Sequence, residues 1–226
     1  MRPLTLNRPK PLIEVSGRSL LDRALDAIHR SAVEQVAVNV HYLPEQIENH
    51  LKDRRDPVCA ISDERGLLLD SGGGVKKALS LLPPQGQTII VNSDSFWLDG
   101  NHNNLDELIG QFDPDQMDLM LLLCRKDQGI GFDGAGDFFM DSDGHLTRRG
   151  DAATAPTIYA GAIIANADLF TEMEEEVFSL NLLFDRAIAR KRLFGKMLDG
   201  LWLHVGTPEA IDEAEEAMAR FELAHA

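Results

Sequence analysis

Apolar runs of strand length alternate with amphipathic helical segments along most of this chain, and no other feature constrains its fold as strongly. Residues 36–40, 88–91 and 117–124 are almost continuously apolar, without a polar residue at every second position. Strands of a parallel sheet typically have such continuous apolar sequences, because helices cover both faces of the sheet. The pattern predicts an α/β fold with a mostly parallel sheet and helices on both sides.

The same periodicity places the remaining elements. Helices are expected where apolar residues recur every three or four positions, and strands where short apolar runs are bounded by turn-forming residues. The expected helices span residues 19–31, 44–51, 74–82, 104–112, 180–193 and 208 to the C-terminus, and the expected further strands span residues 57–62, 158–165 and 201–205.

A β-hairpin is expected over residues 138–148, because two short strand-like runs flank an Asp143-Gly144 turn. The chain contains no linker or low-complexity segment, so a single domain over residues 1–226 is the simplest interpretation. Its two halves cover about residues 1–125 and 126–226. The second half, which contains the hairpin, is expected to form a lid or the wall of a pocket.

The net charge of −15 limits the classes of partner. It disfavours a nucleic-acid backbone and an anionic membrane surface, which carry charge of the same sign. No apolar run reaches the roughly 20 residues that a membrane span needs, and the N-terminus is too polar for a signal peptide. A cytoplasmic protein with small-molecule partners is therefore expected.

Three consecutive glycines, Gly72, Gly73 and Gly74, stand where the helix over 74–82 is expected to begin, shortly after Asp70. Glycines at a helix start allow another group to approach the backbone closely and leave N–H donors free. A nucleotide base or ribose needs such contacts. A flexible loop that leads into a helix is an equally good interpretation of the glycines alone.

Asn92 and Asp94 follow directly after the apolar run 88–91. Ligands of open α/β sheets bind beyond the carboxyl ends of the strands. A carboxylate there is a common ligand of Mg²⁺, which prefers oxygen and shares its shell with phosphates. The alternatives are that Asp94 caps a helix and that Asn92 holds the turn.

Lys10 and His204 are two further candidates. Lys10 lies between two prolines, so its backbone is restrained and its charge can be held near a phosphate at low entropic cost. An exposed lysine on a stiff loop is the alternative. His204 lies near the end of the strand over 201–205, which a Gly-Thr-Pro turn follows, and is either a hydrogen-bonded structural histidine or a ligand.

The order of these motifs resembles that of the sugar-1-phosphate nucleotidyltransferase family. The matching segments are residues 1–12, 70–74, 92–94, 159–161 and 202–207, and together they extend along essentially the whole chain. The resemblance implies a Rossmann-like fold with a small β-hairpin part that binds the sugar. It also implies that a sugar-1-phosphate oxygen attacks the α-phosphate of a nucleoside triphosphate and expels pyrophosphate, with Mg²⁺ as the cofactor.

The resemblance also implies residue roles. Lys10 corresponds to the catalytic lysine that contacts the phosphates. The other implied roles are nucleotide binding by Asp70, Gly72 and Gly73, substrate binding by Asn92, Asp137 and Gly161, and metal binding by Asp94 and His204. His204 replaces the usual second metal-binding aspartate, and imidazole suits softer metals. It therefore binds a phosphate, binds a metal such as Mn²⁺, or leaves the metal to Asp94.

The resemblance is strongest to short members that use UTP and an N-acetylmuramate-type sugar phosphate, with mannose-1-phosphate guanylyltransferase-like members as the alternative. The family's glycine-rich turn and arginine, and the strand before them, have no counterpart ahead of Met1. A missing central strand leaves two unpaired sheet edges. We therefore expect the chain to be truncated at its N-terminus, with a non-catalytic nucleotide-sugar-binding protein as the second alternative.

Overall fold

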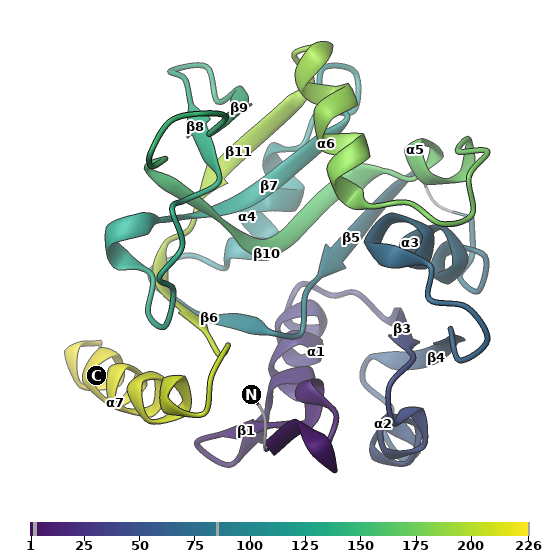
Figure 1. Cartoon of the computed structure of the whole chain (residues 1–226), viewed down its shortest axis with the longest axis vertical. Helices are drawn as coiled ribbons and strands as arrows, with labels where there is room; N and C mark the ends of the chain where they lie inside the picture. The colour runs from purple at the N-terminus through teal and green to yellow at the C-terminus, as the bar shows by residue number, and fades with distance from the viewer. Residues whose placement is uncertain (2–3, 85, 226) are drawn as a thin grey trace.

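The computed structural model describes residues 1, 4–84 and 86–225, and strands and helices alternate through the first half of the chain (Figure 1). The strands are β1 (Glu14–Val15), β2 (Arg18–Ser19), β3 (Gln35–Val40), β4 (Val58–Asp63), β5 (Gln87–Val91), β6 (Ser95–Asp99), β7 (Leu119–Arg125), β8 (Phe138–Met140), β9 (Leu146–Arg148), β10 (Thr157–Asn166), β11 (Leu193–Met197) and β12 (Gly200–His204). The helices are α1 (Leu20–Arg30), α2 (Pro44–Leu51), α3 (Asp70–Leu79), α4 (Asn104–Gln111), α5 (Asp168–Thr171), α6 (Leu180–Ala189) and α7 (Glu209–Ala224), with single 3₁₀ turns η1 (Leu4–Leu6), η2 (Lys10–Leu12) and η3 (Lys126–Gln128).

Six of the described strands form one mixed sheet, in which β10 lies between β5 and β7. β10 is antiparallel to both, since Ile163 pairs with Leu121 of β7 on one side and with Ile90 of β5 on the other. β11 extends the sheet beyond β7 in parallel. The α/β class is confirmed, but an antiparallel strand runs through the expected mostly parallel sheet. A continuous apolar run indicates that both faces of a strand are buried and says nothing of its direction.

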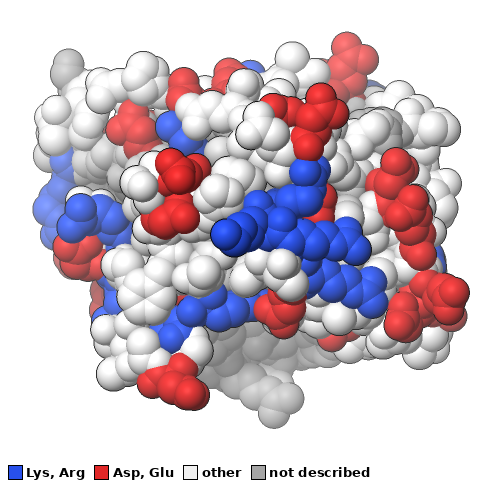
Figure 2. Space-filling view, turned by 90° about the horizontal axis from the view of Figure 1, so that it is seen from above, with Lys and Arg blue, Asp and Glu red and all other residues white. Residues whose placement is uncertain are grey.

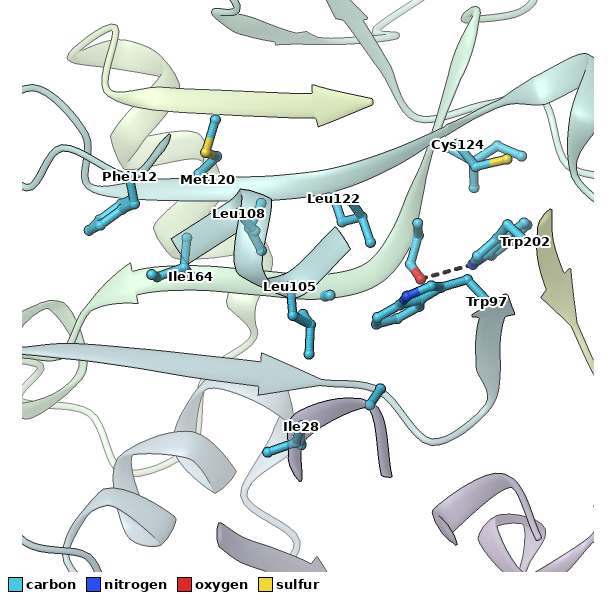
Figure 3. Packing of buried hydrophobic residues seen from close by; sticks show 14 of the residues in the cluster. Ile28, Trp97, Leu105, Leu108, Phe112, Met120, Leu122, Cys124, Ile164 and Trp202 are labelled. Carbon is cyan, nitrogen blue, oxygen red and sulfur yellow. Dashed lines mark hydrogen bonds between the residues drawn. The ribbon is translucent and has the colours of Figure 1, made fainter. Parts of the chain in front are cut away.

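Both faces of this sheet are covered, as the sequence predicts. Met120 and Leu122 of β7 pack with Leu108 of α4 in one buried cluster, which Figure 3 shows between the sheet and the helix. Leu121 points to the opposite face and packs with Leu183 of α6. Each fully buried leucine contributes about 1.5–3 kcal/mol relative to an exposed one.

Three smaller strand pairs lie outside this sheet, and one of them is the antiparallel pair of β1 and β2. β3 pairs with β4 in parallel along its whole length, and β6 pairs with β12 in antiparallel, with Trp97 opposite Trp202. Among the described strands, β3 has no partner other than β4, and β5 has none other than β10. Each of these two strands therefore has one edge without a neighbouring strand.

Most predicted elements lie where they are expected, including the hairpin, whose turn residue Gly144 has a φ of +89°. The others differ. α6 ends at Ala189 rather than at 193, because Lys191 takes a φ of +55° and turns the chain into the unpredicted strand β11. β1, β2, β6 and α5 are also unpredicted. α3 begins at Asp70, so the glycines lie inside the helix rather than before it.

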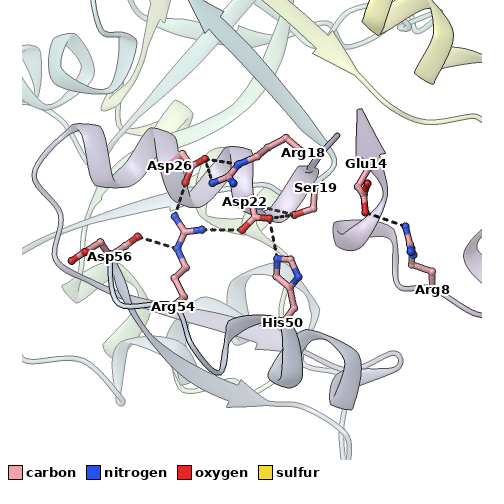
Figure 4. Close-up of polar contacts among 9 residues, drawn as sticks. All are labelled: Arg8, Glu14, Arg18, Ser19, Asp22, Asp26, His50, Arg54 and Asp56. Atoms are coloured by element: carbon pink, nitrogen blue, oxygen red, sulfur yellow. Dashed lines mark hydrogen bonds and ion pairs between the residues drawn. The ribbon is translucent and has the colours of Figure 1, made fainter. Parts of the chain in front are cut away.

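An ion-pair network joins α1 to the β3–α2–β4 unit (Figure 4). Arg54, from the loop before β4, donates to Asp22 at 2.9 Å and to Asp26 at 2.6 Å, both on α1. His50 of α2 lies 3.0 Å from the Asp22 carboxylate, and Arg18 donates to Asp26 at 2.9 Å. The network adds to an apolar cluster between the same elements, in which Leu21 and Leu25 of α1 pack with Ile47 of α2.

Lowering the pH below about 4 is expected to destabilise the fold through Asp22. Burial raises the pKa of this carboxyl, but the Ser19 hydroxyl, His50 and Arg18 together outweigh it, so the pKa lies below its usual 3.8. The stabilisation is therefore complete above the unfolded-state pKa and is lost as the pH falls through the folded-state pKa. In urea unfolding between about pH 5 and 3, the parent should lose more stability than Asp22→Asn. Equal slopes would contradict this account.

Candidate functional site

A cleft of about 590 Å³ opens at the carboxyl ends of β3 and β5. Its walls come from α1, the first turn of α3, the turn after β5 and the short helix η2, segments that are far apart in the sequence (Figure 1). The polar residues that line it are Lys10, Asn39, His41, Glu64, Asp70, Ser71, Asn92, Ser93 and Asp94.

The cleft unites only part of the predicted site. Four of the predicted residues line it, namely Lys10, Asp70, Asn92 and Asp94. The remaining ones are not among its lining residues, and these are Gly72, Gly73, Asp137, Gly161 and His204.

Lys10 and Asp94 face each other across the cleft. The Lys10 ammonium lies 3.3 Å from a carboxylate oxygen of Asp94, and the two side chains are 29% and 45% exposed. Pro9 precedes Lys10, whose carbonyl accepts the Ile13 N–H at 3.0 Å, so the local backbone is restrained as predicted. A partly exposed ion pair of this kind contributes about 0–1 kcal/mol. Both charges therefore exchange this contact for a ligand at low cost.

Asn92 is held next to β10 by a direct backbone bond. Its N–H donates to the Gly161 carbonyl at 2.7 Å, at an irregularity of β10 between Tyr159 and Ile163. Gly161 has a φ of +92°, and a Cβ there would lie 2.6 Å from the Ser95 hydroxyl. The glycine thus permits the bend of β10 that holds Asn92 at the mouth of the cleft.

The glycines of α3 are packed against another segment of the chain, and their role in nucleotide binding stays a prediction. The N–H groups of Gly72 and Gly73 both donate to the Phe178 carbonyl, at 2.9 and 3.0 Å. A Cβ on Gly72 would lie 2.3 Å from the Phe178 ring, and one on Gly73 would lie 2.1 Å from the Glu176 carbonyl oxygen. Neither a free nucleotide cradle nor a flexible loop is present. The glycines let the chain before α6 pack directly against α3.

A buried carboxylate that was not among the predicted site residues lies beneath the cleft. Glu64, only 5% exposed, accepts from the Asn39 amide at 2.7 Å and from the Leu69 N–H at 3.1 Å. The same amide also donates to the Gly74 carbonyl at 2.9 Å, which ties β3 and β4 to α3. Asn39 and Glu64 lie at the carboxyl ends of strands. The rule that pointed to Asn92 would therefore have found them as well.

Tyr159 and Asp137 belong to the second half of the chain, and Tyr159 lies close enough to Asp94 for the two to interact electrostatically. One carboxylate oxygen of Asp137 accepts a hydrogen bond from the Tyr159 N–H at 2.9 Å, and this bond fixes the side chain against β10. The Tyr159 hydroxyl is buried and has no hydrogen-bond partner among the described residues. Burial, with a smaller contribution from the charge of Asp94, raises the pKa of this phenol.

Replacing Tyr159 by Phe is expected to leave the free energy of unfolding unchanged or to raise it by up to about 1 kcal/mol, because a buried hydroxyl without a partner is removed. Thr157→Val is the matched control on the same strand, since its buried hydroxyl donates to the Phe138 carbonyl at 2.7 Å. That variant should lose about 1–2 kcal/mol. Chemical denaturation of both variants makes the comparison, and equal losses would contradict it.

His204 is held away from the lining of the cleft. Its Nδ1 lies 3.1 Å from the Gly131 carbonyl, and its ring stacks on Trp202 with the centroids 6.1 Å apart. A carbonyl oxygen can only accept, so Nδ1 is the protonated nitrogen in this contact. No group of three acidic, histidine or cysteine side chains with the geometry of a metal site occurs among the described residues.

Surface charge is distributed unevenly. Seen from the α6 end, lysine and arginine side chains form a connected band, although the net charge is −15 (Figure 2). At this end Arg148 pairs with Asp185 at 2.8 Å and Arg192 with Asp118 at 2.6 Å, so part of the positive charge is neutralised. In the described part of the chain no helix has both the length and the apolar character to cross a membrane.

Relatives and solved structures match nearly the whole chain. It is 38% identical to an N-acetylmuramate alpha-1-phosphate uridylyltransferase of Caulobacter vibrioides, over 97% of the chain and 92% of that protein. It is 24% identical to mannose-1-phosphate guanylyltransferase 1 of Arabidopsis thaliana, over 92% of the chain and 58% of that protein. The fold matches the crystal structure of HddC from Yersinia pseudotuberculosis complexed with GMP-PN, with a TM-score of 0.73, 19% identity, and 93% and 90% of the two chains covered.

A model of the MobA-like NTP transferase domain matches residues 5–175, a stretch that contains the whole cleft lining except Leu180. The match extends across most of the strands and helices that position Lys10 and Asp94. With this match and the 38% identical relative, the chain belongs to the MobA-like NTP transferase family and is a sugar-1-phosphate nucleotidyltransferase.

Proposed function

We propose that this chain joins UTP to N-acetylmuramate 1-phosphate and releases pyrophosphate. The observation that carries the choice of substrates is the similarity to the Caulobacter uridylyltransferase over 97% of the chain. A cleft that contains the ammonium of Lys10 and the accessible carboxylates of Asp70 and Asp94 is chemically suited to this reaction, because the substrates are anionic and need both a cation and a metal ligand.

In the proposed reaction, an oxygen of the sugar phosphate attacks the α-phosphorus of UTP. The new P–O bond forms as the bond to the bridging oxygen breaks, and its electron pair leaves with pyrophosphate. Such transfers depend on positioning and charge stabilisation rather than on a covalent intermediate. Lys10 would turn from Asp94 to the phosphates and stabilise the charge that develops on them.

The donor set fits Mg²⁺ held by one protein carboxylate. Mg²⁺ commonly takes one or two carboxylates and completes its shell with phosphate oxygens and water. Asp94 offers an accessible carboxylate at the strand end, whereas one nitrogen of His204 is already bonded to Gly131. We therefore place the metal on Asp94, and metal binding by His204 stays a prediction. Bound there, Mg²⁺ would neutralise phosphate charge.

We place the nucleotide along the start of α3 and the sugar towards β10. Asp70 lines the cleft at the first turn of α3, and Gly72 and Gly73 shape that turn from behind. Asn92 lines the cleft on the opposite side, bonded to Gly161, with Asp137 close by through Tyr159. This arrangement follows the two halves of the chain that the sequence predicts.

Pyrophosphate release tests the assignment. UTP, GTP, CTP and dTTP are each combined with N-acetylmuramate 1-phosphate, mannose 1-phosphate and glucose 1-phosphate, with and without Mg²⁺. We expect the highest kcat/KM for UTP with N-acetylmuramate 1-phosphate. Preference for GTP with mannose 1-phosphate would favour the activity named for the Arabidopsis relative. Tight binding of UTP without turnover would favour a non-catalytic nucleotide-binding role.

A further inference from the structure

Residues 4–8, which lead to Lys10, lie at the surface with little burial. No residue of the turn η1 is buried, and its two leucines are 43% and 52% exposed. Arg8 pairs with Glu14 at 3.5 Å, but both side chains are more than half exposed (Figure 4). An exposed ion pair of this kind contributes little to stability. Apolar burial therefore does not hold this segment in place.

Hydrogen bonds from one neighbouring turn hold it instead. The Tyr42 hydroxyl donates to the Leu6 carbonyl at 2.9 Å and lies 3.2 Å from the Thr5 carbonyl, so its single proton is shared between the two. The Gln46 amide donates to the Asn7 carbonyl at 2.9 Å. Three successive carbonyls of the segment thus accept from two side chains that are four residues apart, and Tyr42 and Gln46 together form a clamp on it.

The turn that carries the clamp is itself fixed at the carboxyl end of β3. Nδ1 of His41, a residue that lines the cleft, lies 2.8 Å from the Glu64 carbonyl. Leu43 takes a φ of +49°, and its carbonyl accepts the Gln46 N–H at 3.1 Å, where Pro44 opens α2. The clamp is therefore attached to a strand end that forms the cleft, and it holds residues 4–8 relative to this wall.

The clamp belongs to the surface and not to the core. Tyr42 is 53% exposed and takes part in none of the buried apolar clusters formed by the described residues. Removing its hydroxyl therefore leaves no cavity, and surface changes of this kind have small effects on stability. The three hydrogen bonds determine where the segment lies far more than whether the chain folds.

We propose that Tyr42 and Gln46 are positioning residues that keep Lys10 in place for the reaction by restraining the segment before it. The inference rests on the proposed function, in which Lys10 turns from Asp94 to the phosphates of UTP. The side chain moves in that step while its backbone must stay in place, since a misplacement of about 1 Å can slow a reaction about 100-fold. Pro9 is buried and has a φ of −66°, which its ring fixes, so it transmits the restraint from the clamp to Lys10.

A double-mutant cycle tests the proposal. The clamp variant combines Tyr42→Phe, which keeps the ring, with Gln46→Met, a neutral side chain of similar length that cannot donate. We expect kcat for pyrophosphate release from UTP and N-acetylmuramate 1-phosphate to fall about tenfold, with KM for UTP changed less than about twofold. In the Lys10→Ala background the same two changes should cause no further loss, because they act through Lys10. Gln35→Met, at the exposed first residue of β3 and thus at its other end, is the matched control and should turn over like the parent.

A second readout needs no turnover. The backbone order parameters of residues 4–8, measured by NMR relaxation, should fall in the clamp variant from about 0.85 to below about 0.6 and stay unchanged in the Gln35 control. The Tm of both variants should lie within about 2 °C of the parent's. Unchanged order parameters, or equal losses of kcat with and without Lys10, would overturn the proposal. Absence of turnover in the parent would contradict the proposed function instead, and the order parameters alone would then support or overturn the clamp.

Discussion

Asp94→Asn is expected to lower kcat/KM for pyrophosphate release by about 10²–10³-fold at saturating Mg²⁺, because the cleft then has no charged ligand beyond β5 for the metal. The amide keeps the size of the side chain but binds Mg²⁺ weakly. The side chain is 45% exposed and takes part in one ion pair, with Lys10. The free energy of unfolding should therefore change by less than about 1 kcal/mol.

Asp53→Asn is the matched control. Asp53 is an exposed carboxylate in the loop between α2 and β4, so it precedes a strand, whereas Asp94 follows one. Its turnover should equal that of the parent. Titration of Mg²⁺ and Mn²⁺ adds a second readout. The Asp94 variant should need a higher metal concentration for half-maximal rate, and an unchanged metal dependence would remove Asp94 from the metal site.

The strands that carry the site could be predicted because their burial leaves a local signature. Residues 119–123 of β7 are buried on both faces, so every position is apolar. Such a run can be recognised as a strand without knowledge of the neighbouring strands. The direction of β10 has no such signature, because direction depends on the connection and not on the side chains. β6 and β11 are five residues each and mix polar with apolar positions, so they escaped prediction.

The site residues divide in the same way. Asn92 and Asp94 were found because a strand end is visible in the sequence, and Asn39 would have been found by the same argument. The packing of Gly72 and Gly73 against Phe178 could not be predicted, because Phe178 follows about a hundred residues later. Close packing of two segments that are distant in the sequence is visible there only as a small residue. A nucleotide that lies against the backbone requires a small residue too, so the sequence does not distinguish the two causes.

Gly73→Ala is expected to destabilise the fold by about 3 kcal/mol or more. The new Cβ would lie 2.1 Å from the Glu176 carbonyl oxygen, a backbone atom that cannot swing aside as the end of a side chain does. Either α3 or the segment before α6 must move, and the two hydrogen bonds to the Phe178 carbonyl would stretch. For a chain of this length the loss corresponds to a fall in Tm of about 6–12 °C.

Gly110→Ala separates this packing effect from the general effect of alanine in a helix. Gly110 lies in α4, and a Cβ there meets no atom within 4 Å, so the variant should gain about 0.5–1 kcal/mol from helix propensity. Thermal unfolding and the KM for UTP are measured for both variants. A Gly73 variant with the parent's Tm but a raised KM would mean that the glycine lies against the nucleotide, as the family resemblance implies. A fall in Tm with an unchanged KM at low temperature would assign it to the packing of α3.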